Sequence, residues 1–109
     1  MMRELKAIIR PERVSEVLHS LHAIPDLPGV TISTVRGFGR RYPPDPALPF
    51  DEVAMSKLEI VVPTALVGSV VEVIARIAHT GRVGDGKIFV IPVEHAVRIR
   101  SGEQGASAL

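Results

Sequence analysis

The chain has 109 residues, a length typical of a single domain, and 46% of them are hydrophobic. It has no cysteine, which excludes disulfides and thiolate metal sites, and its formal net charge of +1 does not favour a nucleic-acid binder. We expect a soluble cytoplasmic protein, because no stretch reaches the roughly 18 apolar residues of a membrane span and no signal-peptide core is present. The mean hydropathy of +0.26 is high for a small domain and indicates subunit interfaces.

The first third of the chain predicts a strand, a helix and a second strand. Residues 5–9 form a short apolar run that ends before Pro11, which is well placed in the first turn of a helix. That helix has one apolar stripe, made of Val14, Val17, Leu18 and Leu21. Residues 25–29 end the helix, and the alternating, β-branched residues 30–35 predict the next strand.

The middle third predicts an exposed loop, a strand and a second helix. Residues 40–56 contain four prolines, which disfavour a helix or a central strand and indicate an exposed loop. Residues 57–62 form a strand that stops at Pro63, and Thr64 is positioned to cap the helix that follows. The stripe of that helix consists of Val67, Val70, Val71, Ile74 and Ile77.

The last third predicts two strands and a tail. Residues 88–91 are continuously apolar, which indicates a strand buried on both faces, and residues 96–100 alternate as a short strand. Residues 101–109 are small and polar, so we expect a flexible tail. The order is βαββαβ with a short additional C-terminal strand. We therefore predict an α+β, ferredoxin-like sandwich that forms one domain, 1–109.

A glycine-rich segment at residues 81–87 has the pattern G-x-x-x-x-G-K of a phosphate-binding P-loop. The match fails at Ile88, where a P-loop has Ser or Thr, and the segment runs from helix to strand rather than from strand to helix. A P-loop NTPase is thereby disfavoured. The three glycines still allow close approach of an anion, and Lys87 supplies a charge. The alternative is a simple connector with a solvated lysine.

Two pairs of arginines are further candidates for anion binding. In a strand, Arg98 and Arg100 point to the same face, where a phosphate would relieve their repulsion. The alternative is a charged edge that discourages aggregation. Arg40 and Arg41 follow Gly39 and are either solvated or anion-binding.

The histidines do not point to a metal site or to catalysis. His19 and His22 lie three residues apart, but they fall outside the apolar stripe and have no obvious carboxylate partner. No catalytic Ser-His-Asp set or carboxylate pair is evident, so we expect no enzyme.

Five stretches together resemble the PII nitrogen-regulatory signal-transduction proteins over nearly the whole chain. They are 7–11 (AIIRP), 35–40 (VRGFGR), 57–63 (KLEIVVP), 80–90 (TGRVGDGKIFV) and 97–103 (VRIRSGE). The resemblance implies a homotrimer with adenine-nucleotide sites in the clefts between subunits, where arginines join from across the interface. The implied nucleotide-binding residues are Ile8, Thr31, Gly37, Phe38, Gly39, Arg40, Val61, Gly84, Asp85, Gly86, Lys87, Arg98 and Arg100.

The chain departs from the family at the positions that serve its second ligand. Arg41 stands where members usually have a glutamine that helps bind magnesium and 2-oxoglutarate, and Met55 replaces the lysine that pairs with 2-oxoglutarate. The recognition loop is shorter and lacks the modifiable tyrosine at its tip; Tyr42 lies near the loop base instead. We therefore do not expect magnesium dependence, uridylylation, 2-oxoglutarate sensing or the usual docking to ammonium channels.

These departures suggest a divergent subtype, similar to the PII-like proteins of carboxysome gene clusters. Arg40 and Arg41 would then hold a small planar anion such as bicarbonate beside ADP, AMP or ATP. An alternative is an interaction module that regulates a membrane transporter, of ammonium or metal-cation type, through a vestigial nucleotide site. In a metal-linked form His19 and His22 would matter. Slow ATPase activity is disfavoured because no base is evident near Lys87.

Overall fold

The computed structural model describes residues 1–41 and 43–109, so Tyr42 lies outside the described residues. Its elements are β1 (Met2–Ile9), α1 (Val14–His22), β2 (Thr31–Arg40), β3 (Phe50–Pro63), α2 (Val67–Ile77) and β4 (Lys87–Val93). Short 3-10 turns lie at Pro11–Arg13, Thr64–Leu66 and Gly105–Ala108. Neither helix in the described part of the chain is long and apolar enough to cross a membrane.

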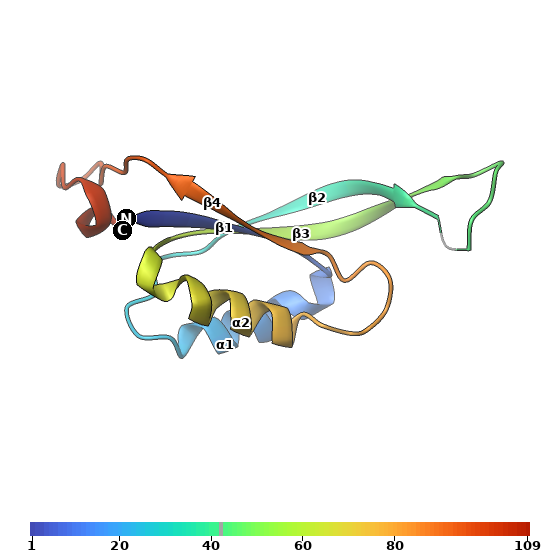
Figure 1. Cartoon of the computed structure of the whole chain (residues 1–109), viewed down its shortest axis with the longest axis horizontal. Coiled ribbons are helices and arrows are strands. Elements are labelled where there is room, and N and C mark those ends of the chain that lie inside the picture. The colour runs from blue at the N-terminus through green and yellow to red at the C-terminus, as the bar shows by residue number, and fades with distance from the viewer. Residues whose placement is uncertain (42) are drawn as a thin grey trace.

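The four strands form one antiparallel sheet in the order β2-β3-β1-β4, and both helices cover the same face (Figure 1). Leu5 on β1 lies opposite Ile60 on β3 and Val90 on β4. The core is aliphatic and forms where the sheet meets the helix stripes; its most buried members are Leu5, Ile9, Val17, Leu21, Leu58, Ile60, Val62, Val70 and Ile74. The predicted ferredoxin-like α+β fold is confirmed.

The two helices begin in the same way, with a 3-10 turn that continues into the α-helix. Pro11 occupies the first turn before α1, as predicted, where its missing N–H leaves no donor unpaired. The predicted capping role of Thr64 is wrong, because Thr64 is already the first residue of the turn before α2. The cap position belongs to Pro63, and no side chain caps this turn.

The expected loop at residues 40–56 is only partly a loop, because both of its ends belong to a β-ribbon. β2 continues to Arg40 and β3 begins at Phe50, so only residues 41–49 connect them. All four prolines fall within that connection. Residues 50–56 contain no proline, so each of their backbone N–H groups can donate a hydrogen bond to a neighbouring strand. The ribbon extends past the end of β1, because Ile9 is the last β1 residue and pairs with Ser56 (Figure 1).

Two further expectations for the C-terminal third are wrong. β4 lies at the sheet edge and is not buried on both faces; Phe89 and Val90 are 46% and 45% exposed in the single chain. Residues 96–100 do not form a strand, because the chain turns back on itself and leaves one isolated bridge between Val97 and Gln104.

The tail at 101–109, which we expect to be flexible, contains local structure in the single chain. It forms the turn Gly105–Ala108, and Arg98 contacts it through two donors. The Arg98 guanidinium donates to Glu103 Oε1 at 3.2 Å and to the Leu109 carbonyl at 2.7 Å.

Candidate functional site

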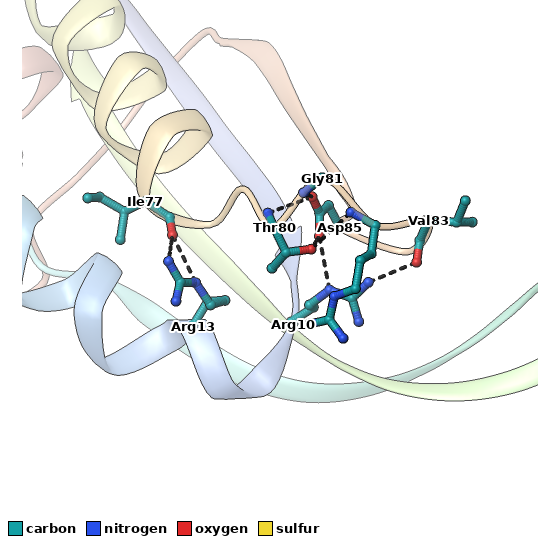
Figure 2. Close-up of polar contacts among 8 residues, drawn as sticks. Arg10, Arg13, Ile77, Thr80, Gly81, Val83 and Asp85 are labelled. Atoms are coloured by element: carbon teal, nitrogen blue, oxygen red, sulfur yellow. Dashed lines mark hydrogen bonds and ion pairs between the residues drawn. The ribbon is translucent and has the colours of Figure 1, made fainter.

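The loop between α2 and β4 is organised around the carboxylate of Asp85 (Figure 2). Its Oδ1 accepts hydrogen bonds from Arg10 Nε at 2.9 Å and from the Thr80 hydroxyl. Its Oδ2 accepts from the backbone N–H groups of Thr80 at 2.8 Å and Gly81 at 2.9 Å. Both oxygens are therefore committed to holding the loop in shape.

This set of donors strongly favours the ionised form of the carboxyl. The Thr80 hydroxyl and N–H, the Arg10 guanidinium and the Gly81 N–H hold the pKa of Asp85 far below its usual range, against the opposing effect of desolvation. Asp85, which we expected to hold phosphate, is a loop-organising anion whose side chain would repel a phosphate. Only its backbone remains suited to the expected role.

Two glycines bring the loop against the end of β1. Gly86 has a φ of 98°, and a Cβ at this position would lie 1.7 Å from the carbonyl oxygen of Ile8. Gly84 has a φ of 100°, and a Cβ there would lie 3.4 Å from Arg10 Nη2. Both glycines permit close approach, as the pattern indicates, but the approaching partner here is the chain itself. That an anion also approaches the backbone at these glycines stays a prediction.

Lys87 is the first residue of β4 and lies opposite Ile8 on β1. Its side chain is exposed, and within the described part of the chain its ammonium has no carboxylate within 4.0 Å. A cavity of about 250 Å³ lies behind the loop, between α2 and β4, with Ile74, Ala78 and His79 on its helix side. The loop thus presents two exposed cations, Arg82 and Lys87, together with the backbone of Gly84 and Gly86, to solvent.

The expected residues of the second strand lie on the projecting ribbon. Gly37 pairs with Val53 and Gly39 with Asp51, while the Phe38 side chain is 70% exposed. Arg40 is exposed at the end of the strand.

Of the two proposed anion-binding arginines, Arg41 already has an anionic partner. Its Nη1 lies 2.6 Å from Asp51 Oδ1. Together with Arg40, it borders a hollow of about 220 Å³ formed with Asp45 and three of the loop prolines. A small anion at Arg41 would therefore have to compete with Asp51.

A second group of expected residues lies at the other end of the molecule. Thr31 and Val61 line a hollow of about 390 Å³ together with Leu109. Leu109 in turn accepts the hydrogen bond from Arg98, so Arg98 adjoins this hollow. Arg100 lies in an exposed turn rather than in a strand beside Arg98.

The glycine-rich loop with Lys87 and the residues around Arg98 are separated by the length of the central strand, β1. Ile8 pairs with Lys87 at one end of β1, whereas Met2 pairs with Val93 at the other, about 20 Å away at ~3.3 Å per residue. The glycine-rich loop and the Arg98 segment lie beyond opposite ends of β1 (Figure 1). A single chain therefore does not bring Lys87 and Arg98 to the same small ligand.

Sequence patterns did not single out Arg10 or Thr80. The available signals were a basic residue directly before Pro11 and a hydroxyl five residues before Asp85. Among the described residues, no three His, Asp or Glu side chains lie close enough to hold a metal ion. His19 and His22 are exposed on α1.

Comparison with known proteins matches residues 2–103 to the family model described as nitrogen regulatory protein P-II. The chain is 41% identical to the nitrogen regulatory protein P-II of Azospirillum brasilense over 113 aligned positions, which cover 99% of this chain and all of that protein. A second relative with the same name, from Rhizobium etli, is 43% identical with the same coverage.

Two solved structures have the same fold. A Bacillus subtilis GlnK–ATP complex superposes with a TM-score of 0.87 at 32% identity, covering 99% of this chain and 97% of that one. Arabidopsis thaliana PII bound to citrate superposes with a TM-score of 0.83 at 44% identity, covering 99% and 92%. On its sequence and its fold, the chain belongs to the nitrogen regulatory protein P-II family of signalling regulators.

Proposed function

We propose that this protein binds an adenine nucleotide between two copies of itself and relays the occupancy to a partner protein. The observation that carries the proposal is the position of its two cationic groups, around Lys87 and around Arg98, at opposite ends of the central strand β1. Neither cationic group alone forms an enclosed phosphate site. When two copies lie side by side, the Lys87 end of one can meet the Arg98 end of the other and enclose the phosphates between them. The similar GlnK of Bacillus subtilis has been solved with ATP, which supports an adenine nucleotide as the ligand.

In this arrangement the phosphates are held by two subunits. One contributes the backbone N–H groups of residues 84–86 and the Lys87 ammonium, and its neighbour contributes Arg98, with Arg100 nearby. Nucleotide phosphates have the charge and the acceptor oxygens to replace Glu103 and Leu109 on the Arg98 guanidinium. The hollow lined by Thr31 and Val61 adjoins Arg98 and has a mixed lining that includes Glu4 and Glu59, so the base would meet both apolar and polar groups there.

The assembly that we propose is a closed homotrimer. The edge strand β4 exposes three successive apolar side chains, Phe89, Val90 and Ile91, and contiguous apolar surface of this kind is suited to a subunit contact. A closed ring covers such surfaces and repeats the same two-sided cleft at each boundary. Native mass spectrometry or light scattering would measure the subunit number directly.

Mixing two defective variants tests the shared site. Lys87→Ala and Arg98→Ala homotrimers should each bind ADP at least tenfold more weakly than the wild type, because each lacks a charged phosphate partner. When equal amounts are unfolded and refolded together, about one cleft in four receives both wild-type halves and should regain wild-type affinity. Calorimetry that finds no recovered high-affinity sites would contradict the shared site.

The relay to a partner protein is assigned to the ribbon of β2 and β3. It projects beyond the core and exposes Phe38, Leu48 and Phe50, which can be buried by another protein. We also propose that Arg40 and Arg41 hold a small planar anion such as bicarbonate, in competition with Asp51. If the wild-type protein binds no adenine nucleotide in calorimetry, the interaction module with a vestigial site is the better description.

A further inference from the structure

We propose that Arg10 is a positioning residue, which sets the shape of the phosphate-binding loop without touching the ligand. Its guanidinium makes two contacts to the loop, one on each side of Gly84 (Figure 2). Nε donates to Asp85 Oδ1 at 2.9 Å, and Nη2 donates to the Val83 carbonyl at 2.8 Å. The fork therefore spans the three residues 83–85 and fixes both ends of that turn.

The local sequence permits the backbone turn that this contact needs. Gly84 has a φ of 100°, which side chains rarely adopt, and it allows Val83 and Asp85 to face the same guanidinium. The side chains of Arg10 and Asp85 are only 18% and 23% exposed, so their attraction is less screened than that of a fully solvated pair.

The guanidinium is also carried by a rigid part of the backbone. Arg10 directly follows β1, precedes Pro11, and accepts a hydrogen bond from the Arg13 N–H at 3.0 Å. Its attachment point is therefore fixed relative to Ile8, against which Gly86 packs. The central strand thus determines the position of the loop by two contacts, one steric and one ionic.

An arginine is required for this role because the two acceptors lie in different directions. A planar guanidinium presents separate donors to a carboxylate and a carbonyl, whereas a lysine ammonium is a single point charge on a flexible stem. The Arg10→Lys variant would keep the charge and lose the two-point contact. This variant separates positioning from simple charge balance.

The inference rests on the proposed nucleotide site, and its first test uses a ligand series. Adenosine, AMP, ADP and ATP are titrated into the wild type and the Arg10→Lys and Arg10→Gln variants by calorimetry. Because the loop contacts phosphates only, we expect ADP and ATP affinities to fall about tenfold and the adenosine affinity to change less than about twofold. An unchanged ratio of ADP to adenosine affinity in folded Arg10→Lys overturns the proposal.

Two other arginines provide matched controls. Arg13 is also structural, since its Nε and Nη2 donate to the Ile77 carbonyl at the end of α2 at 3.0 and 2.6 Å. Arg13→Gln should lower the melting temperature without changing the affinity ratio. Arg76 lies on the exposed side of α2 beside Glu72, so Arg76→Gln controls for the loss of one positive charge.

A second measurement needs no ligand and separates this inference from the proposed function. The amides of Thr80 and Gly81 donate to Asp85, so their hydrogen exchange reports on the loop directly. Arg10→Lys should speed their exchange about tenfold and leave the α2 amides unchanged. Unchanged exchange in the variant refutes the positioning role. Faster exchange in the variant, together with a wild-type protein that binds no nucleotide, refutes only the proposed function.

Discussion

Gly86 packs directly against the carbonyl group of Ile8. A Cβ at position 86 would lie 1.7 Å from the Ile8 oxygen and 2.8 Å from its carbonyl carbon, which no rotamer change can relieve because both atoms belong to the backbone. The φ of 98° independently disfavours any side chain. The contact fixes the distance between β1 and the loop that precedes Lys87.

We therefore predict that Gly86→Ala displaces the loop and weakens ADP binding by at least about tenfold, with a lower melting temperature. Gly68 is the matched control, because it lies in α2 and a Cβ added there would meet nothing within 4 Å. Gly68→Ala should keep ADP affinity and raise stability by roughly 0.5–1 kcal/mol, from helix propensity. Equal ADP affinity in Gly86→Ala and the wild type would contradict the steric argument.

The low pKa of Asp85 makes part of the stability pH-dependent. In the folded protein the carboxyl stays ionised to well below its usual range, whereas in the unfolded chain it takes up a proton at about pH 3.9. The unfolded state then binds more protons, so the stabilisation is complete at neutral pH and is lost as the pH falls below about 5.

The prediction is tested by denaturant unfolding from about pH 7 to about pH 3. The free energy of unfolding should fall more steeply with acid in the wild type than in Asp85→Asn, which cannot titrate. Glu72→Gln removes an exposed carboxylate on α2 and should keep the wild-type slope. Parallel curves for the wild type and Asp85→Asn would show that the carboxylate does not carry this dependence.

The aliphatic core predicts a large effect at Leu58. This side chain is 0% exposed on β3, between the helices and the neighbouring strands, and its removal leaves a cavity. Leu58→Ala should lower the free energy of unfolding by about 2–5 kcal/mol, measured by circular dichroism in urea at a fixed protein concentration. Ile32 pairs with Leu58 but is 45% exposed. Ile32→Ala should therefore lower the free energy of unfolding by about 0.5 kcal/mol or less.

The ion pair between Arg41 and Asp51 should weaken the proposed binding of bicarbonate at Arg41. Because the Asp51 carboxylate lies 2.6 Å from the guanidinium, Asp51→Asn should leave Arg41 available. An exposed pair is worth up to ~1 kcal/mol, so bicarbonate should bind about fivefold more tightly to the variant in the presence of ADP. Glu52→Gln instead frees Arg36 on the same ribbon and should leave bicarbonate binding unchanged. Bicarbonate binding that responds equally to both variants would count against Arg41 as the anion site.

The fold was predictable where local periodicity agrees with tertiary packing. The stripe that contains Val17 and Leu21, and the strand that contains Leu58 and Ile60, are buried as the pattern indicates. The ribbon was not predictable, because the pairing of Gly37 with Val53 is set by the partner strand and not by the composition of residues 50–56. The same limit explains β4: an apolar run predicts burial, but its position at the sheet edge is a property of the topology.

At the site, residue type predicted the glycines but not the role of Asp85. The need for Gly84 and Gly86 follows from their backbone conformation, which the glycine-rich pattern indicates directly. The assignment of Asp85 depended on Arg10, which lies 75 residues away in the sequence. Arg98 was identified as a candidate from its charge, whereas its contact with Leu109 depends on a turn that alternation did not reveal.

The distance in sequence between Arg10 and Asp85 also has a consequence for the order of folding. The guanidinium can reach the carboxylate only after β4 has paired with β1, a contact that closes most of the chain into a loop. The residues around Asp85 should therefore acquire their native geometry late in folding, after the helices and the central strands have come together. A nascent or partly unfolded chain then lacks this turn, and phosphate recognition is confined to molecules whose sheet is complete.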